Sequence, residues 1–167
     1  MEKNYVVYHL HSDLSNGVTN IDSVTKYNEY IDYAKSLGMK AMAFSEHGSV
    51  LEWVHKKNAI EKAGMKYIHA EEFYVTKELY QYPDDTELCE SLLGTDPEEA
   101  QNKIYEFLEE NKFQVRDNYH CVLIAKNYEG VKELNTLSSK AFVRDGHFYY
   151  QPRISFEELI NTSENIL

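Results

Sequence analysis

The stretches SLGMKAMAF (residues 36–44) and KAGMKYIHA (residues 62–70) share one pattern, in which a helix end is followed by Gly-Met-Lys and then by an apolar strand. Apolar residues at helical spacing precede them, as at Ile31 and Ala34, and glycine often closes a helix in a left-handed conformation. Together with an apolar strand expected at residues 5–10, the pattern predicts the order β-α-β-α-β. That order implies parallel strands joined by right-handed crossovers, and therefore an α/β sheet or barrel.

Downstream the alternation is interrupted and then resumes. An acidic block at residues 78–117 contains 12 Asp and Glu against three basic residues, which accounts for −9 of the total charge of −11. After it we expect a strand at 122–125, a helix at 128–142 and a short helix at 156–160. The final Asn-Ile-Leu suggests the opening of another strand. We therefore expect one incomplete domain over residues 1–167, with the acidic block as an insertion within it.

The composition, 43% hydrophobic and 27% charged, is typical of a soluble globular chain. No apolar run approaches the ~20 residues needed to cross a bilayer, and the N-terminus lacks the features of a secretory signal. Two cysteines are too few for a disulfide framework, which favours a cytoplasmic location without a membrane partner. An acidic surface repels phosphates, so this chain alone is not expected to bind nucleic acid tightly.

Metal-binding residue types gather where the expected strands end. The carboxyl ends of parallel strands meet at one edge of a sheet, so these side chains should lie close together. His9 and His11 are two residues apart, and alternation along an extended chain points both to the same side. Imidazole and carboxylate together suit Zn, Mn or Fe, and a carboxylate such as Glu72 can bridge two ions. The residues at the three strand ends are His9, His11, Glu46, His47, His69, Glu71 and Glu72.

These residue types also have a purely structural interpretation. A lone buried histidine is more often a hydrogen-bonded core residue than a ligand. That is the expectation for His55, His69 and His147. Adjacent glutamates are usually solvated surface residues. His9 and His11 differ, because two imidazoles on one face, beside other candidate ligands, would bury polar groups without cause.

The acidic block contains an amphipathic helix by sequence, PEEAQNKIYEFLEENK (residues 97–112). Asp96 stands at its N-cap and a proline follows, which are favoured residues at a helix start. Ile104, Phe107 and Leu108 fall on one side, so we expect the helix to cover the barrel while its glutamates stay in water. Because burying many charges is costly, the insertion is expected at the surface, without metal ligands.

Five segments carry a family resemblance: YHLHSDLSNG (8–17), GMKAMAFSEHGS (38–49), KYIHAEEFYV (66–75), YHCVLIAKNYEGVKELNTLSSKAF (119–142) and FYYQPRIS (148–155). In this order they resemble the PHP domain, named for polymerase and histidinol phosphatase, as it occurs at the N-terminus of bacterial DNA polymerase III alpha subunits. The resemblance covers nearly all of the chain except the acidic block. It implies a distorted seven-stranded β/α barrel, truncated here, with up to three divalent metal ions at the strand ends. Zn, Mn or Mg is expected, in an incomplete set of sites.

The resemblance also implies a role for each matching residue. His9 and His11 would share a metal ion, and His47 matches the histidine of the second motif. Glu72, rather than Glu71, falls at the bridging carboxylate, because AEEFY aligns with the family pattern Gly-x-Glu-x-Tyr. The metal ligands implied in this way are His9, His11, His47, Glu72 and His120.

Four further residues are expected as accessories. Glu46 precedes the histidine of the second motif, where the family usually has Asp, and Glu71 neighbours the bridging carboxylate. Asp13 could replace the family's loop aspartate, at whose place this chain has Asn16, a poorer ligand. Arg153 lies in the family's Pro-Arg-Ile signature. An equally open interpretation is that its stem packs and its guanidinium bonds carbonyl groups.

The resemblance implies an N-terminal PHP fragment of a DNA polymerase III alpha subunit, acting in DNA replication. The metal ions would serve 3'–5' exonuclease proofreading or would support the polymerase structurally. The catalytic aspartates of the DNA-directed DNA polymerase, a nucleotidyltransferase, lie outside this chain, as do the domains that contact DNA, dNTPs and other replisome subunits. Two alternatives stay open: a stand-alone metal-dependent phosphoesterase of the histidinol phosphatase type, and a non-catalytic scaffold module. The segments LIAKN and FYYQPRIS favour the polymerase.

Overall fold

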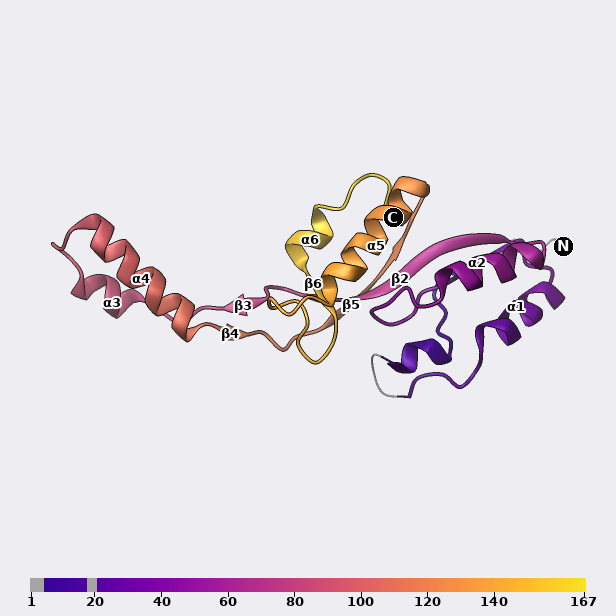
Figure 1. Ribbon diagram of the computed structural model, residues 1–167, viewed down its shortest axis with the longest axis horizontal. Helices are drawn as coiled ribbons and strands as arrows, with labels where there is room; N and C mark the ends of the chain where they lie inside the picture. Colours follow the sequence, from indigo (N-terminus) through magenta and orange to yellow (C-terminus); the bar gives the residue numbers. More distant parts are fainter. Residues whose placement is uncertain (1–4, 18–20) are drawn as a thin grey trace.

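The chain folds into a mixed α/β arrangement, seen in the computed structural model for residues 5–17 and 21–167. Residues 1–4 and 18–20 of the expected domain lie outside the described residues. A long twisted strand crosses the body of the molecule with helices packed along it, and a slender arm extends away from this body (Figure 1). The expected α/β class is confirmed.

The long strand is β2 (Lys66–Thr76), and it pairs along both of its edges. On one edge it pairs in parallel with β1 (Ala41–Phe44) and, further along, with β6 (Arg153–Ser155). On the other edge β5 (Tyr119–Ile124) runs antiparallel to it. The sheet is therefore mixed, and parallel pairing describes only its first strands. The antiparallel strand arises because the chain leaves β2 and returns beside it, without the crossover helix that a parallel neighbour requires.

Residues 5–10, expected as a strand, form only a single parallel bridge to β1, at Val7. The segment still runs beside β1, since Ala43 N donates to Val7 O (2.9 Å) and Ser45 N donates to Leu10 O (3.0 Å). The ladder is interrupted at Leu10, whose N–H donates to the Ser45 hydroxyl rather than to a carbonyl (3.2 Å). The expectation of a regular strand is wrong here, although the parallel direction is as predicted.

Two helix–strand joints follow the repeated sequence pattern. α1 (Tyr27–Ser36) precedes β1 and α2 (Trp53–Lys62) precedes β2. The glycine two residues beyond each helix has a positive φ, 74° in one case and 84° in the other, which glycine adopts without steric cost. α5 (Tyr128–Ala141) and α6 (Phe156–Ile160) then match the helices expected after the acidic block.

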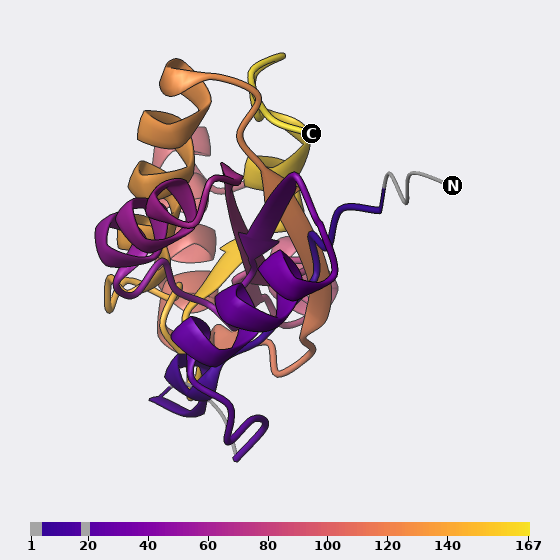
Figure 2. The same ribbon diagram turned by 90° about the vertical axis from the view of Figure 1, so that its right-hand side faces the viewer.

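Two apolar cores hold these elements together, and Figure 2 views the body end-on. The first joins α1, α2 and β1, and the second joins β2, β5, β6 and α5. Full burial of one large apolar side chain contributes roughly 1.5–3 kcal/mol, so these clusters fix the strands on which the site is built. Their buried members include Ile31, Met42, Phe44, Ile60, Phe73, Leu123, Leu134 and Ile154.

The acidic block forms the arm, made of β3 (Tyr80–Gln81), α3 (Thr86–Ser91), α4 (Pro97–Asn111) and β4 (Phe113–Gln114). β3 and β4 pair as an antiparallel ribbon that continues the direction of β2 and β5 away from the body (Figure 1). The Asp96 side chain accepts from the backbone N–H of Glu98 and Glu99, so the expected N-cap is confirmed.

One expectation for α4 is wrong. Its apolar side was expected to cover the barrel, but α4 packs against α3 at the far end of the arm (Figure 1). The reason is geometric, because the β3–β4 ribbon carries both helices outward along the strand direction. Ile104, Phe107 and Leu108 are each half-buried there.

The strands do not close into a barrel within the described residues. Six strands are present among them, in one four-stranded sheet and the separate β3–β4 ribbon. At its end the chain returns to the sheet, where Ala125 and Ile166 form an antiparallel bridge beside β5. The expected further strand is not formed among the described residues, where only this isolated bridge is present.

Candidate metal centre

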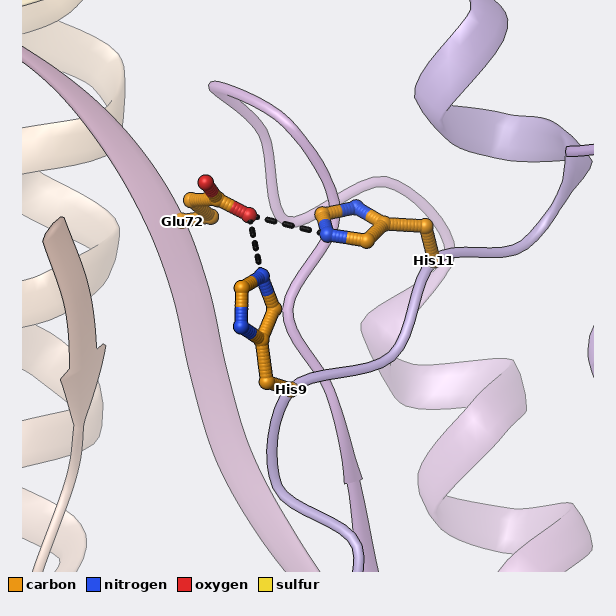
Figure 3. Close-up of side chains that lie close together, drawn as sticks. All are labelled: His9, His11 and Glu72. Carbon is orange, nitrogen blue, oxygen red and sulfur yellow. Dashed lines mark hydrogen bonds and ion pairs between the residues drawn. The ribbon is translucent and has the colours of Figure 1, made fainter. Parts of the chain in front are cut away.

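Three histidines converge on the carboxylate of Glu72, although Glu72 lies within β2 rather than at its end, where the sequence had placed it. His9 Nε2 lies 2.6 Å and His11 Nε2 2.8 Å from Glu72 Oε2 (Figure 3). His120 Nδ1 lies 2.6 Å from the other oxygen, Oε1. The Glu72 side chain is only 6% exposed, whereas the rings of His9 and His120 are half exposed and reach it from the solvent side. We call the set His9, His11, His47, Glu72 and His120 the Glu72 cluster.

Different elements bring these side chains together. His9 and His11 come from the extended segment beside β1, and their alternation turns both rings toward β2 (Figure 3). Glu72 lies in the middle of β2, and His47 follows β1 and forms a parallel bridge with it. His120 lies at the start of β5, opposite Tyr74. Because β5 is antiparallel, its first residues lie beside the far half of β2, which explains a ligand candidate at the beginning of a strand.

Asp22 is a further member of the site, and the sequence reasoning missed it. Its Oδ2 lies 3.3 Å from His47 Nε2 and 3.9 Å from His11 Nδ1. The described residues hold three overlapping groups whose ligand atoms lie within 4.8 Å of one another. They are His9–His11–Glu72, His11–Asp22–His47 and His47–Glu72–His120.

The loop between His11 and α1 explains why Asp22, and not Asp13, reaches the centre. Asp13 begins the short 3₁₀ helix at 13–17 and pairs with Lys26 (2.6 Å), so its expected role as a substitute ligand is not supported by its position. Asn16 Oδ1 accepts from the backbone N–H of Asp22 (2.7 Å) and of Ser23 (3.1 Å). Asn16 thus shapes the loop that presents the aspartate. An acidic residue following a loop asparagine was the only signal in the sequence.

The electrostatics of the cluster follow from these contacts. Burial alone would raise the pKa of Glu72, but hydrogen bonds from His11, His120 and His9 outweigh it and lower the pKa to about 2. Burial lowers the pKa of His11, yet the Glu72 carboxylate more than compensates and raises it above 6.5. Burial, reinforced by the nearby His11, lowers the pKa of His47 below 6.5. The carboxylate is therefore ionised at neutral pH, and His47 is a neutral ring with a lone pair.

The residues present fit a divalent metal ion. His47 Nδ1 is buried, has no hydrogen-bond partner and lies 3.8 Å from Glu72 Oε2. An orphaned imidazole nitrogen beside an ionised carboxylate is an arrangement that a cation satisfies. Nitrogen and oxygen donors of this kind suit Zn or Mn.

Comparison with known proteins shows which family the sequence of this chain belongs to. The family described as PHP domain matches residues 8–167, which is nearly the whole chain. The chain belongs to the PHP domain family. Curated relatives named DNA polymerase III subunit alpha include those of Aquifex aeolicus (29% identical, covering 100% of this chain and 12% of the relative) and Treponema pallidum (28%, 98% and 11%). The Helicobacter pylori protein of that name is 27% identical over 100% of this chain. The chain thus spans 11–12% of the length of these relatives.

Glu46, expected as an accessory residue of the Glu72 cluster, lies behind the histidines rather than among them. Its carboxylate is buried and accepts from Lys56 Nζ (2.8 Å) and from the hydroxyls of Ser12 and Ser15 (both 2.5 Å). Burial would raise the pKa of Glu46, but Lys56 and the serines hold it below its usual value.

Glu71 lies on the opposite face of β2 from Glu72, because neighbours in a strand point to opposite sides. Its carboxyl oxygens are buried and make no hydrogen bond that would hold a charge. Burial raises the pKa of Glu71 to about 8, although Ser138 opposes the shift. An accessory role at the centre is not supported by this position.

Arg153 is fully buried and serves the architecture of the PHP domain. Its guanidinium donates to the carbonyl oxygens of His147 (3.2 Å), Gly146 (2.9 Å) and Val115. The guanidinium also lies 5.3 Å from the centre of the Tyr149 ring. The structural interpretation of Arg153 is the one the geometry supports.

Two of the remaining histidines, His69 and His147, fit their structural interpretation as well, whereas His55 is not the buried core residue that was expected. His69 is buried and bonded to Tyr67 (2.7 Å) and Asn135 (3.0 Å). His147 is buried between Asp145 (2.5 Å) and Glu158 (3.0 Å). His55 is exposed on α2.

A cavity of about 380 Å³ opens beside the Glu72 cluster. Asp22, His47 and His120 form part of its wall, so a molecule in the cavity would reach the candidate ligands. Asn118 and Gln151, joined by a 2.7 Å hydrogen bond, also line the cavity. A larger, mostly apolar cavity of about 460 Å³ shares only His120 with the Glu72 cluster.

Among residues 5–17 and 21–167, no helix has the length and apolar character needed to cross a membrane.

Proposed function

We propose that this chain is the N-terminal PHP region of a DNA polymerase III alpha subunit, and that the Glu72 cluster holds divalent metal ions. The observation that carries the proposal is the convergence of three imidazoles on one buried carboxylate in a chain that matches the PHP domain over residues 8–167. Zn or Mn suits the nitrogen-rich ligand set better than Mg. The proposed ligands are His9, His11, His47, Glu72 and His120, with Asp22 as an addition.

The domain boundaries belong to the same proposal. Residues 1–167 form the N-terminal part of a PHP barrel of seven strands, and residues 78–117 are an insertion that contributes no ligand. The length of the relatives supports this, because the matched region is only 11–12% of each. The arm extends away from the body that carries the Glu72 cluster, which supports the statement that the insertion contributes no ligand (Figure 1).

A bound divalent ion would polarise a phosphoryl oxygen and lower the pKa of a bound water. The chain's own residues prepare for this in three ways. Glu72 supplies an ionised carboxylate, His47 supplies an unprotonated nitrogen, and the adjoining cavity lets a phosphate ester approach the side of the centre formed by Asp22, His47 and His120. In the whole protein this centre serves 3'–5' proofreading or supports the polymerase, which acts on DNA and dNTPs with other replisome subunits in the cytoplasm.

Metal binding is tested on the purified chain. Calorimetric titration with Zn²⁺ and with Mn²⁺, after removal of metal by a chelator, should show saturable binding. His9→Ala and His11→Ala should weaken it most, whereas His55→Ala, which removes an exposed histidine away from the cluster, should leave it unchanged. Absence of binding to the unmodified chain, or an equal loss in all three variants, would refute the proposed centre.

A second assay separates the polymerase from a stand-alone phosphoesterase. The cavity, at about 380 Å³, has room for a small phosphate ester, which is the observation that favours the alternative. The metal-loaded chain is incubated with a labelled primed template and with a generic phosphomonoester. We expect no primer extension, because the polymerase aspartates lie in other domains, and no hydrolysis, because the ligands present are only part of the set that the family uses. Turnover of the monoester would instead favour a phosphatase of the histidinol phosphatase type.

A further inference from the structure

A hydrogen-bonded chain runs from His11 into the interior, behind the Glu72 cluster. His11 Nδ1 lies 3.1 Å from Ser15 Oγ, and Ser15 Oγ lies 2.5 Å from Glu46 Oε2. Ser15 and Glu46 are fully buried, so water does not supply alternative partners. We call these three residues, His11, Ser15 and Glu46, the Ser15 relay.

The direction of each hydrogen bond in the relay follows from counting donors and acceptors. A serine hydroxyl has one proton and two lone pairs. The carboxylate of Glu46 only accepts, since it already receives the backbone N–H of Ser12 (2.9 Å) and the ammonium of Lys56 (2.8 Å). The hydroxyl proton of Ser15 therefore points to Glu46.

The two lone pairs of Ser15 then face the histidines. One accepts the backbone N–H of His47 (3.1 Å), which is a fixed donor. The other faces His11 Nδ1, and a contact of 3.1 Å is a hydrogen bond only if that nitrogen carries a proton. The carboxylate of Asp22, 3.9 Å from the same nitrogen, favours a proton there as well.

We propose that Ser15 and Glu46 are positioning residues that keep a proton on His11 Nδ1 and so present Nε2 of the ring as the metal-binding nitrogen. Nε2 is the atom that lies 2.8 Å from Glu72 Oε2, on the side of His9 (Figure 3). The relay thereby assigns His11 to the ion shared with His9 and Glu72. The inference rests on the proposed metal centre, and it adds the residues that set the orientation of one ligand.

Lys56 completes the arrangement. It is buried at the end of the relay, 2.8 Å from Glu46 Oε1, and a buried carboxylate without a cation would be costly. Partners of this kind, behind a metal-binding histidine, fix the ring orientation and typically change metal affinity about 10–100-fold when removed.

The chain offers a matched pair of variants. Ser12 and Ser15 are both fully buried, and each donates to Glu46 over 2.5 Å, but of the two hydroxyls only that of Ser15 is hydrogen-bonded to histidines. Ser15→Ala should weaken Zn²⁺ binding about 10–100-fold in a calorimetric titration, whereas Ser12→Ala should bind nearly as the unmodified chain does. Ser15→Thr, which keeps the hydroxyl, should restore most of the affinity.

Nitrogen-15 NMR of the histidine side chains gives a readout that does not depend on affinity. The His11 Nδ1 proton should be observed and protected from exchange in the unmodified chain, with and without Zn²⁺, and in Ser12→Ala. Zinc attached to Nδ1, or an unprotonated Nδ1 in the metal-free chain, would overturn the inference even if the Ser15 variant does not fold. Equal affinities for the two serine variants would overturn it as well. Failure of the unmodified chain to bind zinc would instead refute the metal centre, and the metal-free spectrum would still decide the hydrogen bond.

Discussion

Replacing Glu72 by glutamine removes the charge on which the cluster converges and leaves the shape of the side chain unchanged. Each pK unit is worth about 1.4 kcal/mol, so the fall in the pKa of Glu72 from 4.5 to about 2 corresponds to about 3 kcal/mol of folding stability. The Glu72 side chain is 6% exposed, but its partners His9 and His120 are half exposed, so solvent screening makes this figure an upper bound. With a urea m-value of about 2 kcal/mol/M, Glu72→Gln should lower the unfolding midpoint of the metal-free chain by up to about 1.5 M.

The pH dependence of this difference follows from the directions of the shifts. Because the folded-state pKa of Glu72 is depressed, its stabilisation is present above pH 4.5 and is lost as the pH falls toward about 2. The pKa of His11 is raised, so the attraction also weakens when the pH rises from 6.5 through that raised value and the ring loses its charge. The difference between the unmodified chain and Glu72→Gln should therefore be largest between about pH 4.5 and 6.5.

Urea unfolding followed by Trp53 fluorescence, in the presence of a chelator, measures this difference at several pH values. In the same variant, Zn²⁺ affinity should fall by more than the roughly 10–100-fold typical of losing a hydrogen-bond partner behind a ligand. A difference in stability that does not vary with pH would refute the electrostatic account of the cluster. Unchanged zinc affinity would refute the role of Glu72 as a ligand.

Three further predictions concern residues around the centre. Glu71→Gln should stabilise the chain by about 3 kcal/mol at pH 7, because the pKa of Glu71 is about 8 in the folded chain, so its carboxyl ionises at this pH only on unfolding. Below pH 4.5 the carboxyl is protonated in both states, so the gain in urea midpoint should vanish there, and zinc affinity should not change at either pH. Replacing residues 82–112 by Asn-Gly, which closes the β3–β4 ribbon in a two-residue turn, should leave zinc affinity intact by calorimetry, and a large loss would place a ligand in the arm. Arg153→Met should lower the free energy of unfolding, measured in urea, by about 3 kcal/mol or more, since three carbonyls lose their donor at about 1–3 kcal/mol each. Under conditions in which the variant is folded, its zinc affinity should equal that of the unmodified chain.

Local sequence patterns determined the secondary structure well wherever the signal lay within one element. The repeated Gly-Met-Lys joints predict α1, β1, α2 and β2, because a glycine that tolerates positive φ ends a helix whatever surrounds it. The spacing of His9 and His11 likewise predicts two rings on one side, since alternation is a property of the extended backbone.

The tertiary structure decided what depends on pairing between distant segments. The antiparallel direction of β5 places His120 beside Glu72, and nothing within residues 119–124 states which edge of β2 they join. The outward course of the arm, which disproved the expected packing of α4, follows from the same pairing, because β3 and β4 extend the ladder of β2 and β5.

The sequence by itself indicated that histidines and carboxylates gather around the predicted strands, and the resemblance to the PHP family named five of them as ligands. Only the tertiary structure brought Asp22 to His47, assigned Asp13 to Lys26, and buried Glu46 behind His11 as a hydrogen-bond acceptor. The physical reason is that residue type sets what a side chain can bind, whereas burial, partners and direction set which of its atoms remain available. Those three quantities exist only once segments far apart in the chain have packed together.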